Sequence, residues 1–324
     1  MFWFKLRMYL LVILMFALIY AIVSMVAYAV GLRNVYFYVI LSSAMIILQY
    51  MLGPHLIQWS MRLRYLKSGE LTNVQNMVKE LSIKAAIPTP RVAVSAIPIP
   101  NAFAFGRGIS DGRVCVTEGI LRLLNEKELK AVLGHEISHL KNRDVLIITL
   151  LSVIPLILYH IGWQLMYMGG GRGRREANVP AWLIGMAAFL AYFLANLLVL
   201  YASRIREYFA DRGSVSLGNP PNELASALYK LVYGSSRAPQ EYIHQIAAVK
   251  AFFVNNPSCA LKELRQLKDL DADYSGSIER SELDALRNKT VHLSATEKLL
   301  ELFSTHPNML KRIKQLSQAT ADFA

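Results

Sequence analysis

Uncharged stretches recur along this chain of 324 residues. Four of them contain no Asp, Glu, Lys or Arg. Each exceeds the roughly 20 residues that a helix needs to cross the core of a bilayer. They cover residues 8–32, 34–61, 145–171 and 177–203. The pattern predicts two membrane-spanning helical hairpins, although the second also fits a pair of helices buried in a soluble core.

These hairpins divide the chain into four expected parts. They are an N-terminal transmembrane hairpin (1–61), a soluble segment (62–144), a second transmembrane hairpin (145–203) and a helical soluble segment (204–324). Basic residues flank the spans mainly on the side of the two soluble segments. By the positive-inside rule, both termini and both soluble segments face the cytosol of a multi-pass protein in the cell membrane. The residues that go against this orientation are Arg172, Arg174 and Arg175.

The net positive charge of the chain indicates which kinds of partner to expect. Lys and Arg number 35 against 23 Asp and Glu, and the mean hydropathy of +0.32 is high for a soluble domain. We assign the basic excess to the membrane flanks and to anionic lipid, because no motif interleaves aromatic and basic residues in the way of nucleic-acid-binding proteins. We therefore expect the lipid bilayer as a partner and no nucleic acid. Two cysteines, Cys115 and Cys259, are too few for a disulfide framework.

The soluble segments predict a mainly α fold with a small β-sheet. Residues 70–86 repeat apolar positions at helical spacing, and 119–143 do so again. Between them, the runs RVAV, NAFAFG and RVCVT are separated by prolines and glycines, which indicates a sheet of about three strands. The chain after residue 203 is mostly helical. The apolar stripe expected on the first helix consists of Leu71, Val74, Met77, Val78 and Leu81.

The sequence HEISH lies in the second of these helical stretches. On a helix, His135 and His139 face the same way one turn apart, so that both can bind one zinc ion. Glu136 lies beside them and can take a proton from a zinc-bound water that attacks a carbonyl. The motif therefore predicts a zinc-dependent peptidase, although taken alone it also fits a solvated helix face.

A catalytic zinc needs a third protein ligand. HEISH is followed by LKNRD, so the third histidine of the extended motif is absent. His139 precedes the third uncharged stretch by roughly 9 Å of helix, and Glu207 follows the fourth by roughly 6 Å. If the second hairpin crosses the membrane, both residues therefore lie at the same membrane face and at a similar depth. We expect Glu207 as the third ligand and Asp211, one turn on, to orient a ligating histidine. The alternative for Glu207 is a surface ion pair with Arg204 or Arg206.

Several segments together resemble the HtpX family of membrane zinc metalloproteases, relatives of the CAAX prenyl endopeptidases. Besides the paired uncharged stretches, they are PNAFAFG (100–106), VTEGILRLL (116–124), HEISHLKNRD (135–144), EYFAD (207–211) and FSTHPNMLKRI (303–313). The resemblance covers nearly the whole chain. It implies a zincin-like (gluzincin) peptidase domain in which zinc is bound by His135, His139 and Glu207. It also implies Glu136 as the general base and Asp211 as a support for the ligands.

The resemblance implies further site residues. His306 is similar to a late family histidine that helps to stabilise the oxyanion, and the alternative is a histidine that merely begins a helix. Arg312 occupies the basic position that follows and is implied as a structural ion-pair partner. One segment is similar to the family's substrate-binding edge strand, which would hold an extended peptide by backbone hydrogen bonds. The alternative is an ordinary edge strand. The segment consists of Asn101, Ala102, Phe103 and Ala104.

Residues 271–282, DADYSGSIERSE, fit the pattern of a calcium-binding loop. Such a loop takes ligands at positions 1, 3, 5, 7 and 12 and has a glycine, here Gly276, at position 6. The alternative is a polar turn between two helices, because these loops normally occur in pairs and we find a single one. The expected ligands are Asp271, Asp273, Ser275, Ser277 through its carbonyl, and Glu282.

Together these features predict an enzyme. We expect an endopeptidase that cleaves misfolded or damaged membrane proteins, or unfolded polypeptides, at the cytosolic face; the quality-control role is what the resemblance implies. One alternative is a processing protease for prenylated or signalling peptides, against which the number of spans argues. Another is a membrane scaffold with a structural zinc, against which the adjacent Glu136 argues. The sequence determines neither the specific substrates nor whether the chain forms homo-oligomers.

Overall fold

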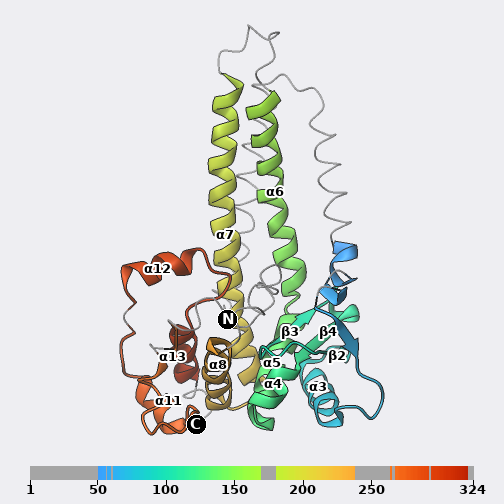
Figure 1. Cartoon of the computed structure of the whole chain (residues 1–324), viewed down its shortest axis with the longest axis vertical. Helices are drawn as coiled ribbons and strands as arrows, with labels where there is room; N and C mark the ends of the chain where they lie inside the picture. The colour runs from blue at the N-terminus through green and yellow to red at the C-terminus, as the bar shows by residue number, and fades with distance from the viewer. Residues whose placement is uncertain are drawn as a thin grey trace. The chain divides into compact units, whose positions relative to one another are not determined.

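The computed structural model describes residues 50–55, 57–59, 61–168, 180–237, 263–264, 267–291 and 293–319 (Figure 1). The expected spans up to residue 49, the arginine-rich loop and Cys259 lie outside these residues. The described residues form a mainly helical fold with one small mixed sheet, which confirms the predicted fold class at that level. In chain order the elements are β1 (Leu63–Tyr65), α3 (Thr72–Ala85), β2 (Arg91–Ser95), β3 (Ala102–Phe105), η1 (Ile109–Asp111), β4 (Arg113–Thr117), α4 (Glu118–Leu123), α5 (Glu126–Lys141), α6 (Asp144–Met168), α7 (Ala181–Ser216), α8 (Pro221–Ser236), α11 (Arg280–Leu286), α12 (Ala295–Leu302) and α13 (Met309–Ala319).

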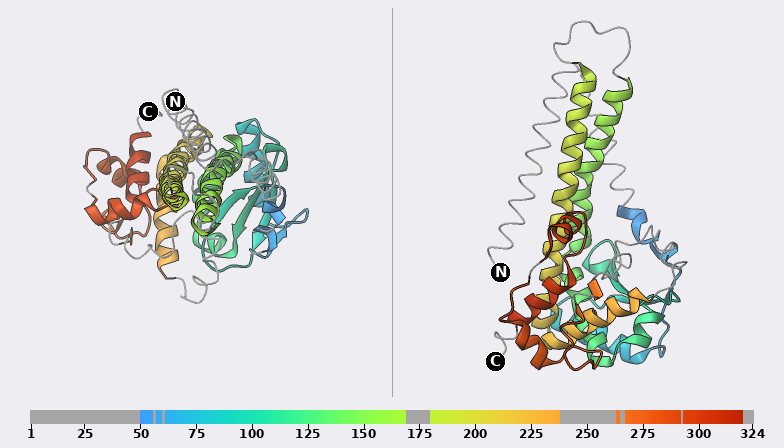
Figure 2. Two further views of the ribbon diagram at one scale, coloured as in Figure 1. Left: turned by 90° about the horizontal axis from the view of Figure 1, so that it is seen from above. Right: turned by 60° about the vertical axis from the view of Figure 1, so that its left-hand side comes forward.

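The chain divides into two compact units, and the first consists of Met1–Met51 and Leu146–Ala202. In its described part, α6 lies along the N-terminal part of α7 (Figure 2). By length and composition, both helices contain a segment able to cross a membrane, Asp144–Trp163 and Trp182–Ser216. The two helices pack through an apolar cluster that includes Leu151, Ile154, Leu158, Ala191, Ala195 and Ala202.

The second unit, Leu52–Val145 and Ser203–Ala324, contains the sheet. The strand order is β1-β2-β4-β3, with β2 and β4 parallel and the other pairs antiparallel. The three runs predicted as strands form β2, β3 and β4. The prediction missed β1, because a strand of three residues is too short to show the alternation of apolar and polar positions. Strand β4 pairs with a strand on each side, and all five of its residues are buried.

The two faces of the sheet have different neighbours, because side chains alternate along a strand. Phe103 and Phe105 of β3 join Cys115 of β4 in a small apolar cluster on one face. Ala102 of β3 and Val114 of β4 belong to the large core on the other face, which also includes residues of α3 and α5. The helix with the HEISH sequence therefore packs against the sheet, with β3 as its neighbouring edge strand.

The helices of this unit begin and end at local signals. The helical stretch expected at 119–143 is two helices, α4 and α5, because Asn125 starts a new one. Its side chain accepts a hydrogen bond of 2.9 Å from the N–H of Glu128, and its own N–H donates to that glutamate at 3.0 Å. The stripe predicted on α3 is correct for its buried members, but Leu71 precedes the helix in the left-handed region and is 41% exposed.

The C-terminal helices complete the large core. Leu228 of α8, Leu283 of α11 and Ile313 of α13 are all fully buried in the cluster that also contains Leu133 of α5. The helix that bears HEISH therefore packs against the sheet, α3 and α8, and α13 in turn packs against α8.

Candidate active site

Helix α5 and the C-terminal part of α7, both in the second unit, approach each other closely at glycines. A Cβ on Gly213 of α7 would lie 1.8 Å from Oγ of Ser138 on α5. A Cβ on Gly134 of α5 would lie 2.8 Å from Oγ of Ser214 on α7. Neither crossing point has room for a larger residue. The close contact brings Glu207, less than two turns before Gly213, to the HEISH segment of α5.

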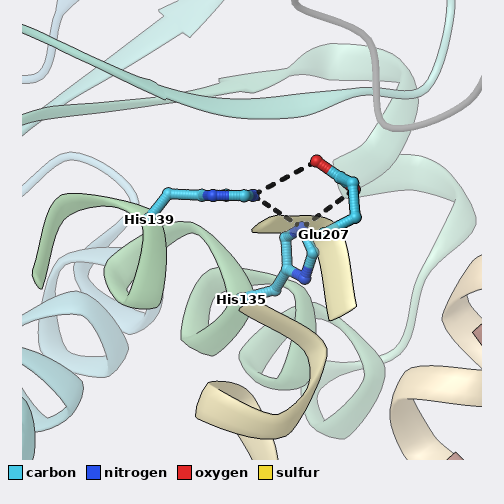
Figure 3. A group of neighbouring side chains, drawn as sticks. All are labelled: His135, His139 and Glu207. Atoms are coloured by element: carbon cyan, nitrogen blue, oxygen red, sulfur yellow. Dashed lines mark hydrogen bonds and ion pairs between the residues drawn. The ribbon is translucent and has the colours of Figure 1, made fainter. Parts of the chain in front are cut away.

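His135, His139 and Glu207 meet with their ligand atoms turned toward one another (Figure 3). Nε2 of His139 lies 3.0 Å from Nε2 of His135. Oε2 of Glu207 lies 3.6 Å from Nε2 of His135, and Oε1 of Glu207 lies 3.5 Å from Nε2 of His139. All three ligand atoms lie within 4.8 Å of one another. The structure therefore brings together the residues that the sequence predicted as ligands.

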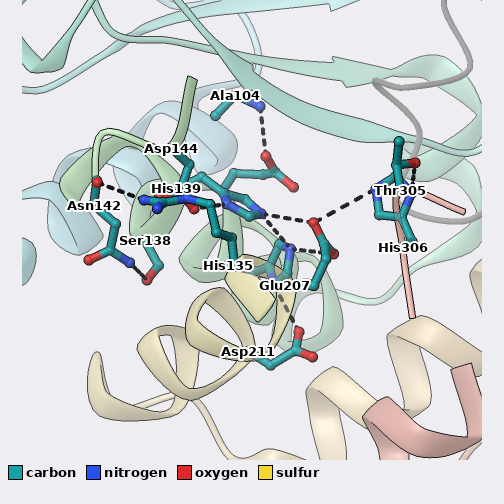
Figure 4. A network of polar contacts seen from close by, with 12 residues as sticks. Ala104, His135, Ser138, His139, Asn142, Asp144, Glu207, Asp211, Thr305 and His306 are labelled. Atoms are coloured by element: carbon teal, nitrogen blue, oxygen red, sulfur yellow. Dashed lines mark hydrogen bonds and ion pairs between the residues drawn. The ribbon is translucent and has the colours of Figure 1, made fainter. Parts of the chain in front are cut away.

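The other ring nitrogen of each histidine faces a buried carboxylate (Figure 4). Nδ1 of His135 lies 2.9 Å from Oδ1 of Asp211, and Nδ1 of His139 lies 2.6 Å from Oδ2 of Asp144. A carboxylate in this position keeps the proton on Nδ1 and leaves the Nε2 lone pair free for a metal. Burial alone would lower the pKa of His139, but Asp144 and the nearby glutamates together raise it to about 9.

These residues fit a zinc ion. Nε2 of His135 and Nε2 of His139 lie 3.0 Å apart, close enough for both nitrogens to bind one cation once they are deprotonated. Two histidine nitrogens and one glutamate oxygen are the protein ligands of one class of catalytic zinc site, which keeps a fourth position open for water. His135 and Glu207 are only 2% and 6% exposed, so the surrounding protein dictates their geometry.

Glu136 lies next to this group but points at the sheet. Its Oε2 accepts a hydrogen bond of 2.6 Å from the backbone N–H of Ala104 on β3. Burial raises the pKa of Glu136, and the positive charge of His135 and His139 opposes this effect. A buried carboxylate with a raised pKa beside a metal-binding group is suited to accept a proton and to release it again.

A buried arginine on α13 holds two of the acidic groups. Arg312 donates to both oxygens of Asp211, from Nε at 2.9 Å and from Nη2 at 2.6 Å. Its Nη1 lies 3.0 Å from Oε2 of Glu207. Burial by itself raises the pKa of Asp211, but Arg312 and His135 hold it below its usual range. The ion pair of Glu207 is therefore buried and involves Arg312, rather than lying on the surface.

A second buried arginine supports the other histidine. Arg206 of α7 donates a hydrogen bond to Asp144 and another, of 3.0 Å, to the carbonyl of Asn142. Asp144 is thereby fixed between Arg206 and His139. The third arginine of this region, Arg204, donates from Nη1 to three carbonyls at the end of α12 and beyond.

His306 reaches the same group from the segment before α13. Its Nε2 lies 3.7 Å from Oε1 of Glu207, and its Nδ1 lies 2.9 Å from the hydroxyl of Thr305. Burial lowers the pKa of His306, which favours the neutral ring. The structure thus places this predicted site residue beside the ligand group.

The segment expected to hold substrate forms the start of β3. Asn101 precedes the strand and is fully buried; its N–H donates to the hydroxyl of Thr117 at 2.9 Å and its carbonyl accepts from the N–H of Thr117 at 2.9 Å. Ala102 and Phe103 are buried, whereas Ala104 is partly exposed. Ala104 is thus the member of this segment that directly contacts the candidate base, Glu136.

The loop at 271–282 also gathers its predicted residues. Asp271, Asp273 and Glu282 place one carboxylate oxygen each within 4.8 Å of the others. Gly276 adopts a φ of 78°, as a sharp turn requires. The carboxylate of Asp271 accepts hydrogen bonds from the N–H groups of Ser275 and Gly276, at 2.9 and 3.0 Å. The carbonyl of Ser277 accepts from the hydroxyl of Ser275 at 3.2 Å.

Sequence reasoning missed several residues that support the site. Asp144 stands in the quoted motif HEISHLKNRD, and its place five residues after His139 was the available signal. Arg206 was considered only as a surface partner. Gly213 and Ser138 gave no signal, because a close crossing of two helices depends on their packing and cannot be inferred from either helix alone.

The fold and the site together define a metallopeptidase, with two histidines and a glutamate arranged to bind a metal ion and a second glutamate beside them. The model of Peptidase family M48 matches residues 69–320, and the chain belongs to this family. The chain is 49% identical over 236 residues to "Protease HtpX homolog" of Methanothermobacter thermautotrophicus, a match that covers 73% of this chain and 88% of that protein. It is 36% identical over 253 residues to "Protease HtpX homolog" of Bifidobacterium longum, covering 76% and 83%.

A solved structure titled "Crystal Structure of S. mikatae Ste24p" matches at 15% identity and a TM-score of 0.49, covering 96% of this chain and 67% of that one. That likeness is too low to bear on the activity. The family match and the HtpX relatives confirm the resemblance found in the sequence and the predicted class of enzyme, a metalloprotease.

Proposed function

We propose that the protein is a membrane-embedded zinc endopeptidase that hydrolyses misfolded or damaged membrane proteins at the cytosolic face. The observation that supports this most is the position of Glu136, which lies beside the ligands without belonging to them and contacts Ala104 of the edge strand. A structural zinc site has four protein ligands. A site with three ligands and an adjacent buried carboxylate is arranged for hydrolysis instead.

In the proposed mechanism, zinc held by His135, His139 and Glu207 would polarise a water molecule and the substrate carbonyl. Glu136 would accept one proton of that water on its carboxylate while the hydroxyl adds to the carbonyl carbon. It would then transfer this proton to the amide nitrogen as the peptide bond breaks. The neutral His306 would donate a hydrogen bond to the oxyanion.

Substrate would bind as an added strand along β3. This strand lies at one end of the sheet order, and among the described strands only β4 pairs with it. The N–H of Ala104 faces the free edge, since it donates to Glu136. A peptide carbonyl could replace Glu136 at this N–H, which would free the carboxylate and place the peptide backbone at the metal. Recognition through backbone atoms suits unfolded polypeptides of many sequences.

The proposed location follows from α6 and α7. Both contain apolar segments of spanning length, and Glu207 follows the uncharged stretch 177–203 by four residues. We propose that both hairpins cross the cell membrane and that the site faces the cytosol. Single cysteines at 170–176 should react with an impermeant reagent added outside intact cells. Labelling only after permeabilisation would contradict this topology.

The activity is tested with the full chain in lipid nanodiscs and an unfolded reporter membrane protein. Removal of metal by a chelator should abolish cleavage, and zinc, but not magnesium, should restore it. His135→Ala should lose both bound zinc and cleavage, whereas the control His55→Ala should retain both. Cleavage of a prenylated peptide but not of the reporter would favour the processing protease. Bound zinc without cleavage of either would favour the scaffold.

Calcium binding at 271–282 stays a prediction, which the family match does not support. Calorimetric titration of the zinc-loaded full chain with calcium tests it. Binding should disappear in Glu282→Gln and persist in Glu279→Gln, because position 12 supplies the bidentate ligand and position 9 often acts through water. Absence of binding to the unsubstituted chain would leave the polar turn as the interpretation.

A further inference from the structure

The short helix α12 has its apolar and polar sides reversed relative to a surface helix of a soluble protein. Leu299, Leu300 and Leu302 are 56%, 45% and 47% exposed. Glu297 and Glu301 lie on the opposite side at helical spacing, and both are partly buried. A surface helix normally turns its apolar side toward the core. This helix therefore presents an outward-facing leucine face, defined by the three leucines.

The acidic side of α12 is fixed to the protein by polar contacts. The carboxylate of Glu301 accepts a hydrogen bond from Lys311 on α13, and its side chain is only 14% exposed. At the start of the helix, Ser294 and Glu297 form a capping box. These contacts determine which side faces outward, so the exposure of the leucine face is not a consequence of a loosely held helix.

Arg204 places α12 at a defined level along α7. Its Nη1 donates to the carbonyls of Glu301, Leu302 and Ser304, at 2.7, 3.1 and 2.8 Å. Arg204 is the first charged residue after the uncharged stretch 177–203. The C-terminal end of α12 is thus attached to α7 at the point where that helix changes from apolar to charged composition.

Exposed apolar side chains also occur elsewhere in the same unit. Leu52 and Trp59 are 45% and 82% exposed. Tryptophan and leucine side chains are typical of the boundary between lipid headgroups and acyl chains.

We propose that the leucine face of α12 inserts into the headgroup–acyl boundary of the bilayer and seats the peptidase unit on the membrane surface. This inference rests on the proposed function in one respect, since it takes the apolar part of α7 to cross the bilayer. Only Phe303, Ser304 and Thr305 separate α12 from His306. The same contact therefore fixes one side of the candidate active site against the lipid surface.

Depth-dependent quenching tests the inference on the full chain in nanodiscs. Cys259 is first replaced by serine, and Cys115 is fully buried and remains unlabelled. A fluorescent probe is attached to Leu299→Cys or Leu302→Cys, and in a control to Asn288→Cys, an exposed position in the turn after α11. Lipids brominated on the acyl chains should quench the probes at 299 and 302 at least about twofold more than the probe at 288, because only the former reach the acyl region.

Equal quenching at all three positions would overturn the inference. A probe at 299 or 302 that is shielded from water but not quenched by brominated lipid would also overturn it, because a second protein surface would then cover the leucine face. Cleavage of the reporter protein is measured on the same samples. Quenching without cleavage would contradict the proposed function alone, and cleavage without quenching would contradict this inference alone.

Discussion

Arg312 and Asp211, 101 residues apart in the chain, form a buried pair with two hydrogen bonds directly behind His135 of the candidate metal site. Arg312 is 0% exposed and Asp211 is 2% exposed. The pair connects α13 to α7 and, through the contact of Arg312 with Glu207, to the candidate metal. The C-terminal helix is therefore part of the support for the site although it supplies none of the three ligands.

Arg312→Ala should destabilise the protein strongly. The substitution leaves the carboxylates of Asp211 and Glu207 buried without their cation, and loss of one partner of a buried pair costs about 3–5 kcal/mol. The midpoint of thermal unfolding of the purified chain measures this loss. Arg122→Ala is the matched control, because Arg122 pairs with Glu118 on the surface, where a salt bridge contributes at most about 1 kcal/mol. Equal shifts in the two variants would contradict the structural role of Arg312.

Gly213→Ala should separate the two helices that carry the ligands. The new Cβ would lie 1.8 Å from Oγ and 2.6 Å from Cβ of Ser138, and overpacking of this kind costs about 1–3 kcal/mol. Zinc affinity should fall with it, because Glu207 moves away from His135 and His139. The second substitution Ser138→Gly removes the clash and should restore zinc binding. If Gly213→Ala binds zinc as tightly as the unsubstituted chain, the close crossing does not position the ligands.

Asp144→Asn should weaken zinc binding without abolishing it. Asp144 contacts Nδ1 of His139 and accepts a hydrogen bond from Arg206, so the neutral amide orients the imidazole less well. Loss of such a partner typically costs 10–100-fold in metal affinity. Competition with a zinc-binding dye measures the affinity, and Asp269→Asn, at an exposed position, serves as the control. An unchanged affinity would show that Asp144 has no influence on the ligand.

The two histidines of the candidate ligand group were predictable from the sequence because their spacing is local. His135 and His139 are one helical turn apart, and Glu207 was inferred from the similar distance of both helices to the uncharged stretches. The partner of His139 was not predictable in this way. Arg143 adopts a φ of 56° between α5 and α6, and this break in the helix determines where Asp144 points.

Contacts between segments that are far apart in the chain were the other feature that could not be predicted from the sequence. Arg312 was named through a resemblance, but its two hydrogen bonds to Asp211 join helices whose packing depends on the whole core. Strand β1 was missed because three residues show no period. The leucine face of α12 reads in the sequence like the core side of a helix, and the hydrogen bonds of Glu301 show that it faces outward.

Glu136→Gln, assayed for cleavage and bound zinc on one preparation, tests the central claim most directly. The amide cannot take a proton from water, and loss of a general base lowers the rate by about 10²–10⁴. Zinc content should stay at that of the unsubstituted chain, because Glu136 is not among the ligands. The control Glu126→Gln, an exposed position on the same helix, should change neither quantity. Full zinc content with undiminished cleavage in Glu136→Gln would contradict the account.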